Sequence, residues 1–210
     1  MPPIIITLKS IIHNIKDKGV IIMAGLYFKY GTMNSSKSAN LLMIKHNYEE
    51  QNFTVKLLKP STDTREKETI IHSRVGLSAP CTLINDDSDL TELCKDYKIV
   101  MVDEAQFLSE KLVDELYEIS YEKVVMCFGL MTDFKRNLFP GSKRLIELCD
   151  SLQEIKSVCS CGRRAVVNAR FKDGKLVLDG AQVEIGAEDK YRALCKYCYH
   201  DLLVERLKEE

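Results

Sequence analysis

Gly31-Thr32-Met33-Asn34-Ser35-Ser36-Lys37-Ser38 is the stretch that decides which fold we expect. It nearly matches the pattern G-x-x-x-x-G-K-[ST], and it stands between a segment typical of a strand (26–30) and a helical segment that opens near Lys37. In such a loop, backbone N–H groups and the positive end of the helix dipole hold an anionic phosphate chain. We therefore expect a phosphate-binding loop, with an ordinary polar turn as the alternative.

Three side chains of this loop carry specific expectations. Lys37 would neutralise the outer phosphates of a nucleotide, and the hydroxyl oxygen of Ser38 would bind Mg²⁺. Ser36 stands where the pattern has glycine, because the turn often needs a positive φ angle or a close backbone approach. These conditions cost a residue with a Cβ atom about 1–2 kcal/mol. We therefore expect weak nucleotide affinity or a slightly remodelled loop.

A second polar group follows an apolar strand, because Ile99-Val100-Met101-Val102 leads directly into Asp103-Glu104. Ligands of open α/β sheets sit at the carboxyl ends of the strands. Asp103 can reach the Mg²⁺ shell, usually through water, and Glu104 can take a proton from an attacking hydroxyl. The alternative is that both carboxylates only cap the next helix. Together with the loop, they favour nucleotide binding.

Apolar runs alternate with helical segments from residue 25 to about residue 156. Further strands are predicted at 53–58, 99–102 and 124–128, the first ending at Lys59-Pro60, and further helices at 109–119 and 141–149. Wholly apolar strands are typical of a parallel sheet that is covered on both faces. The prediction is an α/β fold with a mostly parallel sheet flanked by helices, in a nucleotide-binding domain over residues 23–156.

Four of the eight cysteines form two close pairs, Cys159-Ser160-Cys161 and Cys195-Lys196-Tyr197-Cys198. Four thiolates suit tetrahedral Zn²⁺ with no open position, which predicts a structural site. Disulfides or coincidence are the alternatives. A turn signal at 172–175 and short alternating segments accompany the pairs. We expect a small zinc-binding subdomain over residues 157–210 and, because the other cysteines stand singly, a reducing, cytoplasmic compartment.

Composition narrows the function classes further. Hydrophobic residues make up 45% of the 210 residues and the net charge is −1, so a disordered chain is excluded and nucleic acid is not expected as a main partner. No apolar run reaches the ~20 residues of a membrane-spanning helix, so no membrane partner is expected. Residues 1–22 are interpreted as an N-terminal extension that is not part of the native protein, which would then start at Met23. The alternative is that they form an export signal or an amphipathic helix.

The order and spacing of these motifs resemble the cytosolic, zinc-containing type II thymidine kinases, with the bacterial branch nearest. The matching segments cover nearly the whole chain: 31–38, Asp63-Thr64-Arg65, Ser73-Arg74-Val75-Gly76, 102–107, 129–134, the paired cysteines and 185–191. The resemblance implies transfer of the γ-phosphoryl of ATP to the 5′-hydroxyl of thymidine, and by analogy of deoxyuridine. It also implies a homotetramer and inhibition by dTTP.

The same resemblance implies a set of site residues, with Glu104 as the general base. ATP would be bound by Gly31, Thr32, Met33, Asn34, Ser35, Ser36, Lys37, Ser38, Asp103 and Gln106, and Mg²⁺ by Ser38, Asp63 and Asp103. The nucleoside would be bound by Met33, Arg65, Phe107, Leu130, Phe134, Asn168 and Tyr191. Arg65 or Arg74 would stabilise the transferring phosphoryl group. A lasso-like loop at about 179–190 would close the site, with Ala187 in place of a family glycine.

Two other classes of protein remain possible from the residues. One is a nucleotide-dependent switch with a structural zinc, and the other is a zinc-bearing interaction module whose loop binds an anion passively. Asp133-Phe134, the lasso segment and Glu104 favour a pocket for a small substrate, which neither alternative requires.

Overall fold

The computed structural model describes residues 23–61, 69–182 and 191–208. At its centre lies a six-stranded sheet in which every pairing is parallel. Its strands stand in the order β5 (Thr82–Ile84), β2 (Val55–Pro60), β6 (Ile99–Val102), β7 (Val124–Gly129), β1 (Gly25–Tyr30) and β8 (Ser151–Glu154). The prediction of a parallel sheet is confirmed.

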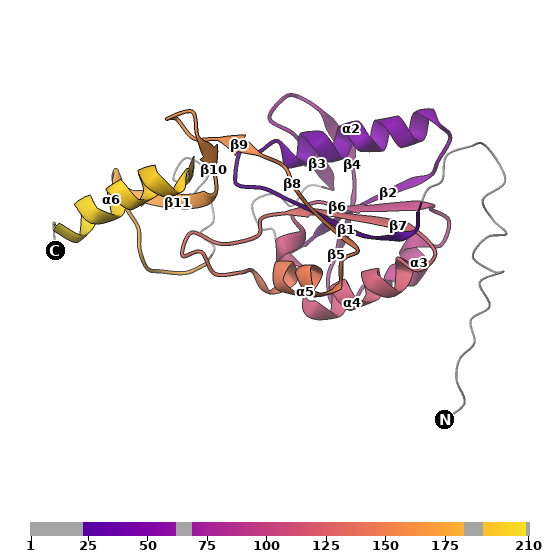
Figure 1. Ribbon diagram of the computed structural model, residues 1–210. Coiled ribbons are helices and arrows are strands. Elements are labelled where there is room, and N and C mark those ends of the chain that lie inside the picture. Colours follow the sequence, from indigo (N-terminus) through magenta and orange to yellow (C-terminus); the bar gives the residue numbers. More distant parts are fainter. Residues whose placement is uncertain (1–22, 62–68, 183–190, 209–210) are drawn as a thin grey trace.

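Both faces of this sheet are covered (Figure 1). Helix α2 (Lys37–Glu50) and the hairpin of β3 (Ile70–His72) and β4 (Ser78–Pro80) pack on one face. The other face carries α3 (Leu90–Cys94), the 3₁₀ helix η1 (Ala105–Phe107), α4 (Glu110–Ile119) and α5 (Pro140–Leu148). Because side chains alternate along a strand, Met101 packs under α2 and its neighbour Val102 packs on the opposite face.

The helices begin where the sequence supplies capping groups. Ser109 Oγ accepts a hydrogen bond from the Leu112 N–H at 3.2 Å at the start of α4, and Asp89 Oδ1 accepts one from the Glu92 N–H at 2.9 Å at the start of α3. The helices predicted at 109–119 and 141–149 are confirmed within one residue at each end. Strand β2 differs from the strand predicted at 53–58, because it includes Lys59 and Pro60 rather than ending before them.

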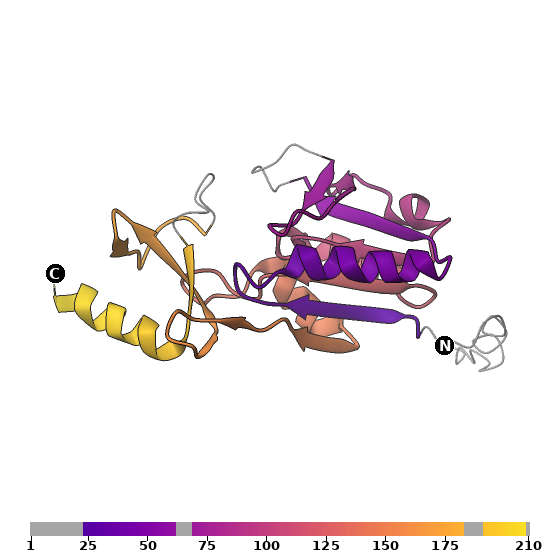
Figure 2. The same ribbon diagram turned by 90° about the horizontal axis from the view of Figure 1, so that it is seen from above.

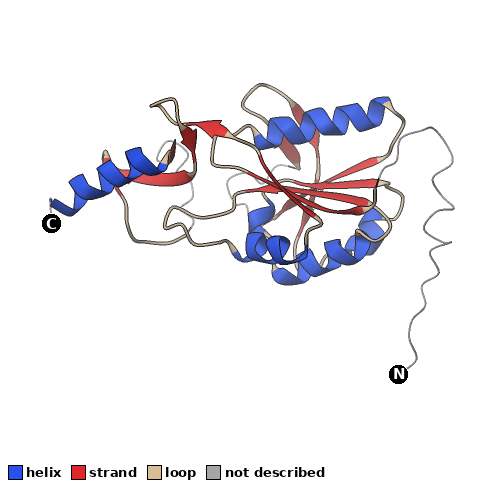
Figure 3. Cartoon of the chain, viewed as in Figure 1, coloured by secondary structure: helices blue, strands red, loops and turns tan. Residues whose placement is uncertain are grey.

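Residues 157–182 and 191–208 form a separate layer with a hydrophobic cluster of its own. Its elements are β9 (Ser157–Val158), β10 (Arg164–Ala165), β11 (Val167–Lys172), β12 (Lys175–Leu176), β13 (Tyr191–Leu194) and α6 (Lys196–Lys208). Figures 2 and 3 show this region beside the six-stranded sheet, with α6 extending away from it. The predicted turn is confirmed: Lys172 pairs with Lys175, and Asp173 and Gly174 both have positive φ angles.

The topology fixes where a ligand can bind. Neighbouring strands β1 and β7 send the chain to opposite faces, β1 to α2 and β7 to α5, which leaves a crevice at their carboxyl ends. The loop 31–36, the pair Asp103-Glu104 and Leu130 all follow strands that end at this edge. No helix within the described residues is both long and apolar enough to cross a membrane.

Candidate active site

The loop between β1 and α2 closes on one carbonyl group. The buried ammonium of Lys37 donates a hydrogen bond to the Thr32 carbonyl at 2.9 Å, and the Ser35 N–H donates to the same oxygen at 3.3 Å. Gly31 leaves no space for a side chain, since a Cβ atom there would lie 2.3 Å from Ser35 Oγ. The loop is thus held in a compact conformation at the carboxyl end of β1.

Two residues of the loop adopt left-handed backbone conformations without being glycine. Asn34 has φ 63°, and Ser36 has φ 60° and ψ 33°. Ser36 lies at the N-cap of α2, is exposed, and makes no side-chain capping bond. The sequence motif places glycine there because this conformation favours it. In this protein the loop therefore keeps the glycine geometry and carries the strain of a Cβ atom.

Asp103 lies beneath the loop as a buried carboxylate that is only partly satisfied. The Ser38 hydroxyl donates to its Oδ2 at 2.8 Å, whereas no group among the described residues hydrogen-bonds its Oδ1. Burial, with the neighbouring Glu104 carboxylate, raises the pKa of Asp103 to about 7, although the Ser38 hydroxyl and the Lys37 ammonium act in the opposite direction. A carboxylate oxygen without a partner beside a hydroxyl is a suitable donor set for Mg²⁺.

Glu104 is held by its own backbone and by a neighbouring amide. It has φ 52° and ψ 37° at the N-cap of η1. Gln106 is 1% exposed, and its Nε2 donates to Glu104 Oε2 at 2.5 Å. A non-glycine residue in this backbone region is uncommon, and such strain clusters at functional sites.

A cavity of about 300 Å³ lies between the loop, the ends of β2 and β6, and the β3–β4 hairpin. Eight residues predicted from the sequence line it: Met33, Asn34, Ser36, Lys37, Ser38, Asp103, Glu104 and Leu130. The structure thus places the phosphate loop and the carboxylate pair around one space.

The other predicted residues that the structure describes do not line this cavity. Gly31, Thr32 and Ser35 form the rest of the loop, while the side chain of Gln106 is buried beside Glu104. Phe107 packs edge-on against Phe139, Phe134 is buried beneath the Arg170 guanidinium, and Tyr191 opens strand β13. Asp63, Arg65 and most of the predicted lasso, including Ala187, lie outside the described residues.

Sequence analysis missed one charged residue of the cavity, Lys59, did not favour His72 as a substrate contact, and weighed Arg74 as a candidate. Lys59, at 5% exposure, is the residue before the last of β2 and lies on the same sheet face as Asp103, and His72 ends β3. Arg74, considered above for the transferring phosphoryl group, lies in the turn of the β3–β4 hairpin and also lines the cavity. A lysine before the proline at a strand end is the signal that could have identified Lys59.

Asn168 joins the C-terminal region to the loop. Its Oδ1 accepts a hydrogen bond from the Met33 N–H at 2.8 Å, and its Nδ2 donates to the Thr132 carbonyl at 3.0 Å. A hydrogen bond between the hydroxyls of Thr32 and Ser157 is a second link. Both atoms of the Asn168 amide are therefore engaged by backbone groups of the two loops that flank the crevice.

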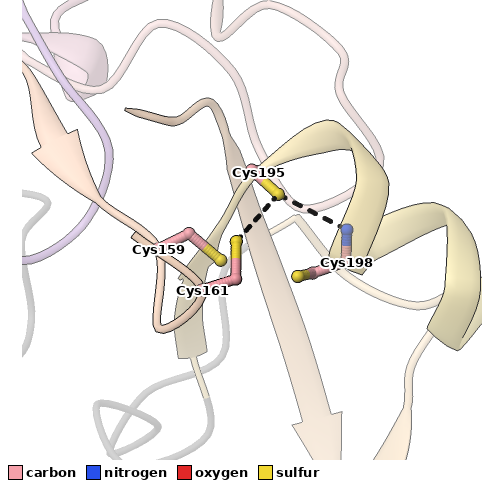
Figure 4. A group of neighbouring side chains, drawn as sticks. All are labelled: Cys159, Cys161, Cys195 and Cys198. Atoms are coloured by element: carbon pink, nitrogen blue, oxygen red, sulfur yellow. Dashed lines mark hydrogen bonds between the residues drawn. The ribbon is translucent and has the colours of Figure 1, made fainter. Parts of the chain in front are cut away.

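The four paired cysteines come together as free thiols (Figure 4). Their sulfur atoms all lie within 4.8 Å of one another, and Cys161 Sγ is 3.6 Å from Cys195 Sγ. Four sulfurs bound at about 2.3 Å to a central zinc ion would be about 3.8 Å apart, so the cluster fits Zn²⁺. Hydrogen bonds from backbone N–H groups of Cys161 and Cys195 lower the pKa of Cys159 to about 6.

The parallel sheet, the loop 31–38 and the adjacent carboxylates of buried Asp103 and half-buried Glu104 define a P-loop nucleotide-binding protein. A family model described as "TK: Thymidine kinase" matches residues 24–199. The chain belongs to the thymidine kinase family, whose members are transferases.

Curated relatives agree with this family. The thymidine kinase of Enterobacteria phage T4 is 42% identical over 86% of this chain and 97% of its own length. That of Lactiplantibacillus plantarum is 42% identical over 84% and 96%. Among solved structures, a Pif1 helicase from Candida albicans has a TM-score of 0.40 and 14% identity over 64% of this chain and 36% of its own, a likeness too weak to indicate function.

The strain at Ser36 predicts the effect of restoring glycine. Ser36→Gly should increase the free energy of unfolding by up to about 1 kcal/mol, because relief of the left-handed Cβ strain exceeds the added entropy of the unfolded chain. Urea unfolding measures this change. Ser36→Ala, which keeps the Cβ atom and removes only the hydroxyl, should match the wild type. Equal stability of all three proteins would contradict strain at this position.

The cysteine cluster predicts the result of metal removal. Zinc-loaded protein should carry one ion per chain, and chelation should lower the midpoint of thermal unfolding by about 10 °C, because binding to four thiolates contributes several kcal/mol to folding. Cys198→Ser should reproduce this loss. Cys81→Ala, outside the cluster, should retain the metal. If chelation removed the zinc and left the midpoint of thermal unfolding unchanged, a structural site would be refuted.

Proposed function

We propose that this protein transfers the γ-phosphoryl group of ATP to the 5′-hydroxyl of thymidine, and also of deoxyuridine, giving the nucleoside monophosphate and ADP. The observation that carries the proposal is that Lys37 and Glu104 line the same cavity of about 300 Å³. One supplies the charge that a phosphate chain needs, and the other supplies a base for the acceptor hydroxyl. The curated relatives are thymidine kinases by name.

The donor side of the reaction depends on residues 31–38. We propose that backbone N–H groups of this loop hold the phosphates of ATP, with Lys37 moving from the Thr32 carbonyl to the outer phosphates. Ser38, Asp103 and, from the family resemblance, Asp63 would hold Mg²⁺, which neutralises charge on the phosphates. The unpartnered Oδ1 of the buried Asp103 supports this assignment.

The acceptor side depends on Glu104. Its carboxylate would take the proton from the 5′-hydroxyl as the O5′–phosphorus bond forms and the bond from phosphorus to the ADP oxygen breaks. Arg74 is in reach of the same cavity and is our candidate for stabilising charge on the transferring group, alongside Arg65. Lys59 and His72 add two further polar groups to this wall.

Recognition of the base is proposed for the side of the cavity that Met33 and Leu130 line. A flat pyrimidine suits sulfur and aliphatic or aromatic faces with polar groups at its edge. Phe107, Phe134, Asn168 and Tyr191, with Arg65, complete the proposed nucleoside site. Closure by the lasso segment would bring Tyr191, which follows that segment, toward the base.

Three further properties are proposed from the family. These are inhibition by dTTP, assembly into a homotetramer and a cytoplasmic location. The free state of all eight cysteines is consistent with a reducing compartment. The nucleotide-dependent switch and the zinc-bearing interaction module are not favoured, because both lack a need for Glu104 in a substrate-sized cavity. A switch would hydrolyse ATP without thymidine, whereas this protein should release ADP only when a nucleoside is present.

The role of Glu104 predicts a large and selective kinetic effect. Glu104→Gln should lower kcat by roughly 10²–10⁴, because the amide cannot accept the hydroxyl proton, while KM for ATP stays within about twofold. A thymidine-dependent ADP-release assay measures both constants. Glu110→Gln, at the exposed start of α4, is the matched control and should behave as wild type. An undiminished kcat in Glu104→Gln would remove the base assignment.

A further inference from the structure

The buried amide of Gln106 is fixed at both ends. Its Oε1 accepts a hydrogen bond from the Leu130 N–H at 2.9 Å, and its Nε2 donates to Glu104 Oε2 at 2.5 Å. The side chain is 1% exposed. Leu130 follows strand β7, so the amide connects the end of a central, wholly buried strand to the carboxylate of Glu104.

The chemistry of the partners determines which way this amide points. A backbone N–H can only donate, so the group facing Leu130 must be the Gln106 oxygen. The NH₂ group must then face Glu104, and a carboxylate is the acceptor it requires. A glutamine side chain has one acceptor oxygen and one NH₂ group with two N–H donors, and each of these two groups makes one of the bonds described above.

The local backbone leaves room for this arrangement and for little else. A Cβ atom at Gly129 would lie 2.7 Å from Gln106 Oε1 and 3.0 Å from the Gln106 backbone nitrogen. Glu104 reaches the amide because its backbone adopts φ 52°, which turns the chain sharply into η1. A glycine and a strained residue thus flank the same hydrogen-bonded pair.

We infer that Gln106 is a positioning residue for the proposed base: it holds the Glu104 carboxylate in one orientation at the cavity and does not itself bind ATP. This inference rests on the proposed role of Glu104. A carboxylate held by a buried donor loses little freedom when the hydroxyl approaches, and misplacement of a catalytic group by about 1 Å can cost about 10²-fold in rate. This inference replaces the expectation that Gln106 contacts the nucleotide, because the oxygen and the nitrogen of its amide are bonded to Leu130 and Glu104.

The experiment is a double-mutant cycle between residues 104 and 106. Gln106→Met keeps the length of the side chain and removes both hydrogen bonds. It should lower kcat about 10- to 100-fold, with KM for thymidine and for ATP within about twofold of wild type. In the Glu104→Gln background the same change should lower kcat less than about threefold, because there is no base left to position. Single-turnover measurements at high enzyme concentration reach these low rates.

Two controls separate positioning from folding. Gln106→Glu keeps the acceptor for the Leu130 N–H but places a second carboxylate beside Glu104, so it should fold and still lose kcat. Gln153→Met, on the exposed edge strand β8, should leave kcat unchanged. Circular dichroism and thermal unfolding show whether each variant is folded.

Three outcomes would overturn the inference. A tenfold rise in KM for ATP with unchanged kcat would make Gln106 a nucleotide contact. An equal loss of kcat in both backgrounds would show that it acts independently of Glu104. A folded Gln106→Glu with wild-type kcat would show that donation to Glu104 has no role. Failure of the proposed function looks different, because the wild-type protein itself would then not phosphorylate thymidine.

Discussion

The amide of Asn168 links the C-terminal region to two loops at the crevice. It binds backbone groups of Met33 and Thr132, which belong to loops leaving neighbouring strands β1 and β7 for opposite faces of the sheet. Strand β11 carries this residue, and its pairing with β13 leads directly into the second cysteine pair. The cysteine cluster therefore supports the loop geometry through a short, hydrogen-bonded path, although it lies outside the cavity.

Backbone strain and an unsatisfied carboxylate oxygen occur together at the edge of the sheet where the cavity lies. Asn34, Ser36 and Glu104 have left-handed backbones, and Asp103 keeps an oxygen without a hydrogen-bond partner among the described residues. The strands that lead to these residues are apolar and buried. Stability supplied by the packed strands can thus offset local costs that the chemistry of phosphate and cation binding requires.

Features that depend on short stretches of sequence were predictable. The loop 31–38, the strands before Asp103 and the chelating spacing of the cysteines follow from local pattern, and the loop geometry even shows Ser36 in the glycine conformation. Lys59 was missed because its place depends on the pairing of β2 with β6, and His72 was not favoured because its place depends on how the β3–β4 hairpin packs. Gln106 was assigned to the nucleotide from the family resemblance, and the orientation of its amide depends on the N–H of Leu130, which is distant in sequence.

Asn168 and Gln106 both hydrogen-bond to main-chain atoms of other loops. Asn168 binds those of Met33 and Thr132, and Gln106 binds the N–H of Leu130. The identities of residues 33, 130 and 132 can therefore drift during evolution without breaking these bonds, because every amino acid except proline presents the same N–H and carbonyl. Positions 168 and 106 have less latitude, because the carboxamide there places a donor and an acceptor on one short planar group. The side chains that line the pocket can therefore change while the hydrogen bonds that hold their backbone in place are kept.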